Sequence, residues 1–285
     1  WKEACDVYAA NFEHPIFQTD LSAIEDMDVF AKWRPDMIIG GPPCQDFSSA
    51  GKRDETLGRA DLTLAYANIV AGVQPEWFVM ENVERITKSH ILKEAIAILR
   101  KAGYGISTTV LDASYCGVPQ SRKRFFMIGY LHSPDGFLDA VLEKKQSKKP
   151  LTVFEYMGDK LDIEFYYRHP RSYARRGIFS VHEPSATIRG VNRPLPKGYS
   201  KHEGDPCEPS EKIRPLTTLE RSRIQTFPED FKWLGSKTTK EQLIGNAVPV
   251  NLGFYVAGCI ADYVREPEKY ANGHAKQLDL FQLLP

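Results

Sequence analysis

Short apolar runs alternate with longer segments of helical spacing through the first half of the chain. The apolar runs predict buried strands at 36–41, 77–80, 104–111 and 124–130, and the helical spacing covers 60–73 and 88–102. Strands that alternate with helices in this way are typical of a parallel, doubly wound sheet. We therefore predict an α/β fold whose ligands bind beyond the carboxyl ends of its strands.

The periodicity weakens between about 133 and 212, where Pro, Arg, Tyr and His are frequent. Helical spacing returns at 216–227 and 249–264. We therefore predict a large domain at 1–149, a smaller loop-rich domain at 150–212, a return of the chain to the large domain at 213–266, and a tail at 267–285.

The charge and cysteine content limit the classes of protein to which this chain can belong. The 37 basic and 37 acidic residues cancel, which does not favour non-specific binding of nucleic acid by the whole chain. Residues 160–201 nevertheless hold nine Lys and Arg against three acids, as either a solvated face or an anion-binding surface. The five cysteines are scattered, which favours neither a zinc site nor disulfides and indicates a reducing, cytoplasmic setting. No apolar run approaches the about 18 residues that a membrane helix needs, so we expect no membrane span.

Two candidate groups follow predicted strands. Cys44 lies after a glycine-proline turn and before a polar, cationic loop, which would favour a reactive thiolate. A lone cysteine can equally be a small buried hydrophobe. Glu81 ends the next strand, where a carboxylate can act as an acid or simply as a cap.

A third candidate group is the run Gln120-Ser-Arg122-Lys-Arg124. In extended backbone alternate side chains share a face, so the amide and both guanidiniums would point one way. Paired guanidiniums suit recognition of phosphate or carboxylate, although charge can also protect an edge strand.

Five short motifs in order resemble the DNA (cytosine-5)-methyltransferase family, of the bacterial restriction-modification type. The resemblance covers nearly the whole chain. The motifs are Gly41-Pro-Pro-Cys-Gln45, Glu81-Asn-Val83, Gln120-x-Arg122-x-Arg124, Arg214-Pro-Leu-Thr-Thr-Leu-Glu-Arg221 through Gln225-Thr-Phe-Pro228, and Gly245-Asn-Ala-Val-Pro249.

The resemblance implies a Rossmann-like sheet dependent on S-adenosylmethionine, a target-recognition domain at 150–212, and covalent catalysis on a cytosine flipped out of duplex DNA. By motif, Cys44 would attack C6, Glu81 would bind N3 and the amino edge, and Arg122 and Arg124 would hold the base and backbone. The implied DNA-binding residues of the mobile loop are Gln45, Ser48 and Lys52, and near the flipped nucleotide they are Thr187 and Ile188.

The resemblance also implies a cofactor site. Trp1 would stack on adenine, and Asp20, next to Leu21, would accept from the adenine amino group. Pro43, Leu62, Asn246 and Val248 would form the methionine side. The family's Phe-x-Gly-x-Gly loop and the acid that binds the ribose are not found. We therefore expect residues before Trp1, or a second chain, to supply them.

The predicted recognition domain offers arginines for guanine edges and phosphates, namely Arg171, Arg175, Arg176, Arg189 and Arg193. Asn192 and His169 are further candidates for reading base edges. The tail carries Gln277-Leu278-Asp-Leu280-Phe281, which resembles the motif by which bacterial replication proteins bind the sliding clamp. We expect a cytoplasmic, nucleoid-associated monomer that binds double-stranded DNA and neither a metal nor a membrane.

Three alternatives stay open. The tRNA-methylating branch of the family shares two of the motifs, although its Cys-Phe-Thr signature is not found. A non-enzymatic DNA-binding subunit would not need a complete cofactor loop. A nicotinamide-dependent oxidoreductase is the least favoured, because no Gly-x-Gly-x-x-Gly follows a strand.

Overall fold

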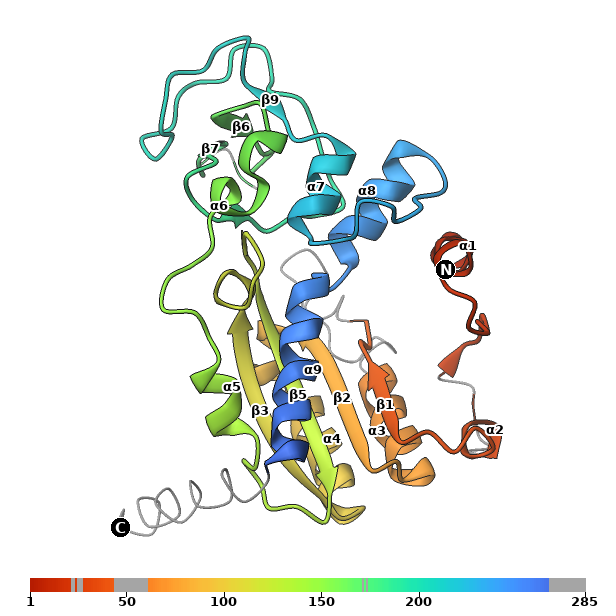
Figure 1. The fold of residues 1–285 in the computed structure, drawn as a ribbon. Coiled ribbons are helices and arrows are strands. Elements are labelled where there is room, and N and C mark those ends of the chain that lie inside the picture. The colour runs from red at the N-terminus through yellow and green to blue at the C-terminus, as the bar shows by residue number, and fades with distance from the viewer. Residues whose placement is uncertain (22–23, 25–27, 44–60, 171, 173, 267–285) are drawn as a thin grey trace. The chain divides into compact units, whose positions relative to one another are not determined.

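The computed structural model describes residues 1–285 except 22–23, 25–27, 44–60, 171, 173 and 267–285 (Figure 1). The chain divides into two compact units that are each built from separate stretches of sequence. The first unit comprises Trp1–Gln18, Asp112–Arg122 and Ser147–Tyr255. The second comprises Thr19–Leu111, Lys123–Gln146 and Val256–Pro285.

A four-stranded sheet forms the centre of the second unit, in the order β1-β2-β5-β3. All four predicted strands are confirmed as β1 (Met37–Gly40), β2 (Trp77–Val83), β3 (Tyr104–Asp112) and β5 (Lys123–Leu131). The predicted α/β fold is confirmed, but the sheet is mixed and not parallel throughout, because β1 and β2 are parallel whereas β2 and β5 are antiparallel. Only ten residues with no long helix separate β3 from β5, whereas a parallel return needs a crossover of about a dozen residues or more.

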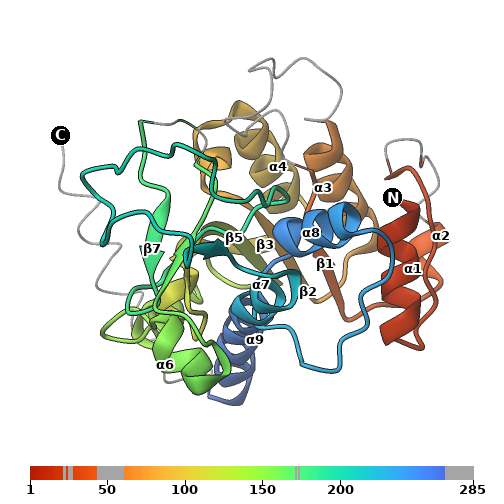
Figure 2. The ribbon, with the colours of Figure 1, turned by 90° about the horizontal axis from the view of Figure 1, so that it is seen from above.

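Helices cover both faces of this sheet. The helices α3 (Asp61–Val73) and α4 (His90–Lys101) lie side by side on one face (Figure 2) and pack on Phe78, Met80 and Met127. The Ser89 hydroxyl caps α4 by accepting from the Ile91 N–H at 3.1 Å. On the other face Tyr263 packs against Trp77. The further helices and turn of this unit are α2 (Asp28–Ala31), the 3-10 helix η2 (Glu84–Lys88), α5 (Asp139–Lys144) and the larger part of α9 (Val250–Arg265).

Tyr66 joins α3 to the ends of the first two strands. Its hydroxyl donates to the Ile38 carbonyl at 3.2 Å and to the Val79 carbonyl at 2.9 Å. Burial raises the pKa of the Tyr66 hydroxyl, so it stays a donor. A Cβ at Gly40 would lie 2.4 Å from the Tyr66 ring, so the last residue of β1 has room for glycine alone. This packing fixes the path of the chain into the Gly41–Pro43 turn.

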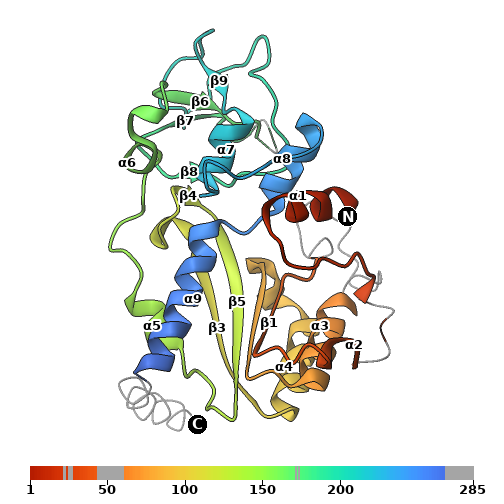
Figure 3. The same ribbon diagram turned by 45° about the vertical axis from the view of Figure 1, so that its right-hand side comes forward.

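The first unit is built from short elements and loops (Figure 3). Its core is formed by Val153, Tyr166, Ile188, Ile224 and Ile244. The buried Asp205 carboxylate holds the loops together, accepting from the Gly177, Ile178 and His202 N–H groups and the Tyr199 hydroxyl at 2.8–3.1 Å. The helices of this unit are α1 (Lys2–Asn11), η3 (Ala113–Tyr115), α6 (Val153–Met157), η4 (Gly158–Lys160), α7 (Thr218–Ile224) and α8 (Lys237–Asn246). The strands are β4 (Gln120–Ser121) paired with β8 (Ser185–Ala186), and β6 (Phe165–Tyr167) between β7 (Ile178–Ser180) and β9 (Arg214–Pro215).

The units differ from the four predicted parts of the chain. Residues 1–18 belong to the first unit, where the Asn11 side chain exchanges hydrogen bonds with the Lys232 backbone at 2.8 and 2.9 Å. Residues 112–122 also belong there, and the segment 213–266 is divided within α9. The predicted helices at 60–73, 88–102, 216–227 and 249–264 are confirmed as α3, α4, α7 and α9.

One apolar stretch is longer than the sequence analysis allowed. Residues 237–265, which include α8 and α9, could cross a membrane by length and composition alone. In α9, however, Val256, Cys259 and Ile260 are buried in the second unit. Packing in the core therefore accounts for the apolar residues on the buried face of α9.

Candidate active site

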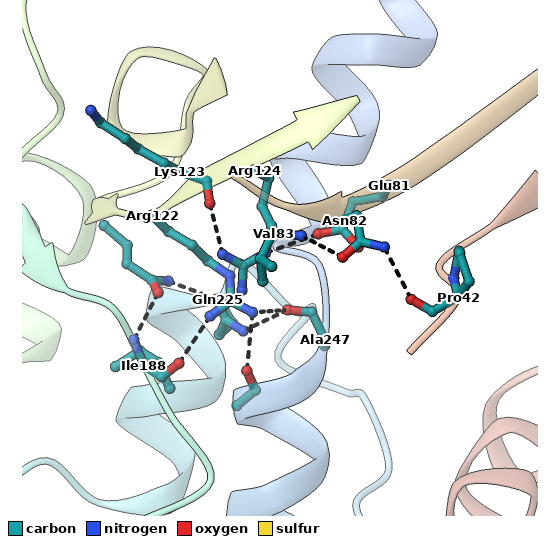
Figure 4. A network of polar contacts seen from close by, with 12 residues as sticks. Pro42, Glu81, Asn82, Val83, Arg122, Lys123, Arg124, Ile188, Gln225 and Ala247 are labelled. Atoms are coloured by element: carbon teal, nitrogen blue, oxygen red, sulfur yellow. Dashed lines mark hydrogen bonds and ion pairs between the residues drawn. The ribbon is translucent and has the colours of Figure 1, made fainter. Parts of the chain in front are cut away.

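Glu81 and Arg124 form a partly buried ion pair on the sheet of the second unit (Figure 4). Arg124 Nε lies 2.9 Å from Glu81 Oε1, and the two side chains are 15% and 19% exposed. In the antiparallel register Glu81 lies opposite Phe126, which makes Arg124 its diagonal neighbour on the same face. The strand direction that the sequence did not predict is therefore what brings the two candidate residues together.

The turn that leads toward Cys44 lies against this ion pair. A Cβ at Gly41 would lie 3.5 Å from Glu81 Oε2. Asn82 Nδ2 donates to the Pro42 carbonyl at 3.3 Å, and Asn82 Oδ1 accepts from the Val83 N–H at 2.8 Å. Cys44 itself lies outside the described residues. Asn82 belongs to a motif of the sequence analysis but received no role there, because its partner is forty residues away.

Arg122 has a different environment, inside the first unit. Its guanidinium is buried and donates to the carbonyls of Ile188 at 2.9 Å, Gly245 at 3.0 Å and Ala247 at 3.0 Å (Figure 4). Three carbonyl partners indicate that this side chain holds loops in place. The sequence analysis expected the side chains of Gln120, Arg122 and Arg124 to share one face. Gln120 and Arg122 do bind the same group of loops, whereas Arg124 pairs with Glu81.

Gln120 joins the same buried network. Its amide donates to Gln225 Oε1 at 2.6 Å and accepts from the Ile188 N–H at 2.8 Å. Gln225 in turn donates to the Ala247 carbonyl at 3.0 Å. Gln225 was assigned no role from the sequence, although it belongs to the motif that ends at Pro228, and this membership was the one sign of its importance. Because Ile188 is buried in this core, we interpret it as a support for Thr187 rather than as a contact to DNA.

Gly245 closes this network at the end of α8. A Cβ there would lie 2.3 Å from the backbone of Arg189 and Gly190. No side chain fits at that distance, so the glycine allows the 189–190 loop to approach the helix. Gly245 and Asn246 are the last two residues of α8.

A buried ion pair lies beside that loop. Arg221 in α7 pairs with Glu241 in α8, and both side chains are about 95% buried. Glu241 Oε1 also accepts from Thr218 Oγ1 at 2.7 Å and from Asn192 Nδ2 at 3.1 Å, and Arg221 Nη2 donates to the Arg189 carbonyl. The Asn192 amide also donates to the Leu216 carbonyl at 2.8 Å, so it supports the loop rather than reading a base.

The candidate cofactor residues divide between the units. The first unit holds Trp1, which is 47% exposed, Asn246, which is exposed, and Val248. The second unit holds Asp20, Leu21, Pro43 and Leu62, of which the first three are exposed. By its chemistry, the exposed Asp20 carboxylate, next to Leu21 in the sequence, suits the amino group of an adenosine.

Among the candidate DNA-binding residues, Thr187 donates through Oγ1 to the Ser121 carbonyl at 2.9 Å. Several candidates lie outside the described residues, and their roles stay predictions, as does supply of the cofactor loop by another segment or chain. They are Gln45, Ser48, Lys52, Arg171, Gln277, Leu278, Leu280 and Phe281.

Comparison with known proteins points to one family. The family model for C-5 cytosine-specific DNA methylases matches residues 1–262. The chain is 58% identical to the type II methyltransferase M.HindV of Haemophilus influenzae, over 94% of this chain and 88% of that protein. It is 54% identical to M.HgiDI of Herpetosiphon aurantiacus, over 94% and 86%.

Solved structures share the fold at low identity. Dnmt2 of S. pombe superposes with a TM-score of 0.66 at 18% identity, covering 92% of this chain and 88% of that one. A methyltransferase of Entamoeba histolytica gives 0.68 at 17% identity, covering 92% and 88%.

Proposed function

The chain belongs to the family of C-5 cytosine-specific DNA methylases, and from that premise we propose that it methylates carbon 5 of a cytosine at a short site in duplex DNA. The observation that carries the proposal is the Glu81–Arg124 pair against the turn that leads to Cys44. The type II names of its relatives support a role in restriction-modification. A DNA substrate supports a cytoplasmic location.

The chemistry assigned to the chain's own residues begins with the Cys44 thiolate, which forms a bond to C6 of the flipped cytosine. Electron density moves toward N3, which takes a proton from Glu81 in its carboxylic acid form while Oε1 keeps its contact with Arg124, and C5 becomes nucleophilic. S-adenosylmethionine, when bound, would supply the methyl group that C5 takes and would leave as S-adenosylhomocysteine. Loss of the C5 proton to water then breaks the bond between C6 and Cys44, N3 returns its proton to Glu81, and the ring is restored.

Arg124 orients the Glu81 carboxylate in this proposal. Its Nε–Oε1 contact leaves Oε2 on the side of Gly41, toward the turn that precedes the nucleophile. Arg122 is assigned a positioning role, because its donors are directed at three carbonyls of the first unit.

We predict that Arg124→Gln lowers kcat/KM about 10- to 100-fold, the equivalent of the roughly 1.5–3 kcal/mol that a hydrogen bond to a charged group contributes. Methyl transfer to DNA at saturating S-adenosylmethionine is the measurement. The control is Lys123→Gln, because the exposed Lys123 ammonium has, among the described residues, a single 4.0 Å contact, with Glu84. Equal activity of the two variants would contradict the role of Arg124.

The experiment that tests the proposed function offers the full-length protein duplex DNA, tRNA and labelled S-adenosylmethionine. We expect label in DNA as 5-methylcytosine, and sequencing of the methylated positions would give the target site. Label in tRNA but not in DNA would favour the RNA-methylating alternative. Label in neither, with DNA still bound, would favour the non-enzymatic subunit.

A further inference from the structure

Arginines of the first unit between 168 and 193 fall into two structural states. Some guanidiniums are held by neighbouring groups, and two others are exposed with no partner among the described residues. Each state occurs close to the other along the sequence: Arg176 is held next to an unpartnered Arg175, and Arg189 is held four residues before an unpartnered Arg193.

Arg176 is fixed on three sides. Its Nη2 donates to Glu183 Oε2 at 2.5 Å, its Nη1 donates to the Gly204 carbonyl at 3.4 Å, and its Cζ lies 4.2 Å from the centre of the Phe179 ring. Glu183 is itself held, because Oε1 accepts from the Ser180 N–H at 3.0 Å. Moving this guanidinium onto a ligand would break the ion pair and the ring contact together.

Arg189 is fixed from both ends. Its side chain donates to the His169 carbonyl, and its own carbonyl accepts from the Arg221 guanidinium. The backbone that follows is pressed against Gly245, at a distance that admits no Cβ. Arg189 is therefore part of the scaffold that sets the path of the loop.

Arg175 is exposed and lines a cleft of about 540 Å³ in the first unit. Hydroxyl groups of Ser114, Ser121 and Thr187 line the same cleft. The two carboxylates that line this cleft, those of Asp112 and Glu183, already have partners. Glu183 binds Arg176, and Asp112 accepts from the Ser114 N–H and hydroxyl and the Ser121 hydroxyl at 2.9–3.2 Å. Among the described residues that line this cleft, Arg175 is thus a cation without a partner, and both carboxylates are taken by other groups. A phosphate could therefore bind the Arg175 guanidinium without displacing an ion pair.

Arg193 is exposed at the end of the 189–193 loop and follows Val191, which is 50% exposed. Burial, and then the charges of Arg193, Arg189 and Arg168, lower the pKa of His169. The cations here therefore repel further positive charge, and an anionic ligand would relieve that repulsion.

We infer that Arg175 and Arg193 bind the DNA, Arg175 through a backbone phosphate, and that Arg176 and Arg189 are positioning residues that hold the loops carrying them. The inference rests on the proposed function and sorts its candidate arginines by role.

The test measures DNA affinity of the full-length protein as a function of salt concentration. We expect Arg175→Gln and Arg193→Gln each to weaken binding roughly tenfold at low salt. Arg175→Gln should also lower the slope of log affinity against log salt by about 0.9, the value for one phosphate contact. Arg175→Lys should restore binding, because a point charge suffices for a phosphate.

The matched controls are Arg176→Gln and Arg189→Gln. These variants remove a charge that is held by groups of the protein, so we expect a lower unfolding temperature and an unchanged salt slope. The inference is wrong if Arg175→Gln binds with the wild-type slope while the wild-type protein methylates DNA. It is also wrong if Arg176→Gln lowers the slope as much as Arg175→Gln does without loss of stability. A wild-type protein that binds no DNA would overturn the proposed function as well.

Discussion

Replacing Cys44 by serine is expected to abolish methyl transfer to DNA, with a loss on the order of 10⁴ or more, as for removal of other covalent nucleophiles. A hydroxyl at this position is almost fully protonated near neutral pH, whereas a thiol is readily converted to a strong nucleophile. The Gly41–Pro43 turn would keep its contacts with Glu81 and Asn82, so DNA binding should persist. The measurement is the rate of methyl transfer beside DNA affinity.

DNA that contains 5-fluorocytosine tests directly whether Cys44 forms the covalent bond to C6 of the cytosine. Fluorine at C5 cannot leave as a proton does, so the adduct of the wild-type protein should persist with S-adenosylmethionine present. The control is Cys5→Ser, in the partly exposed helix α1, which should trap as the wild type does. An adduct formed by Cys44→Ser would remove this residue from the mechanism.

The second large effect is expected from Glu241→Ala, which should lower the free energy of unfolding by about 3–5 kcal/mol. The substitution leaves the Arg221 guanidinium buried without its carboxylate and removes the acceptor of Thr218 and Asn192. Chemical denaturation of the full-length protein measures the change.

Two comparison variants decide whether this loss comes from an uncompensated charge. The double variant Arg221→Met with Glu241→Leu should recover much of the stability, because apolar groups of similar size remove both desolvated charges. Glu208→Ala, which removes the exposed partner of Lys201, should cost less than about 1 kcal/mol. A double variant no more stable than Glu241→Ala would contradict the explanation.

Local pattern was enough to find the strands and most of the regular helices. The apolar runs at 77–80 and 124–130 predicted β2 and β5, because buried strands require nearly continuous apolar sequence. Strand direction could not be read in the same way, since either direction buries the same side chains. The assignment of α1 to the first unit depends on Asn11 and Lys232, which are 221 residues apart.

In the candidate site, the sequence identified the important residues but not the role of each. Order and identity of the motifs pointed to Glu81 and Arg124, and their ion pair supports that choice. The same motif gave Arg122 and Arg124 one role, but Arg122 binds carbonyls of distant loops. Arg175 and Arg176 are equivalent by residue type, and only the positions of Glu183 and Phe179 distinguish them. Residue type reports what a side chain can do, whereas its neighbours decide whether it is available.

The loop at 188–190 is held through main-chain groups as well as through the side chains of Ile188 and Arg189. Ile188 offers its N–H and carbonyl to Gln120 and Arg122, the Arg189 carbonyl accepts from Arg221, and the backbone at 189–190 lies against Gly245. Main-chain groups are the same in every residue, so this part of the attachment depends on the backbone path and not on the side chains that follow Arg189. Exposed positions such as Val191 and Arg193 can therefore change while the anchor stays constant. A graft of a new recognition loop should succeed when it keeps this backbone path, whatever sequence it carries beyond the anchor.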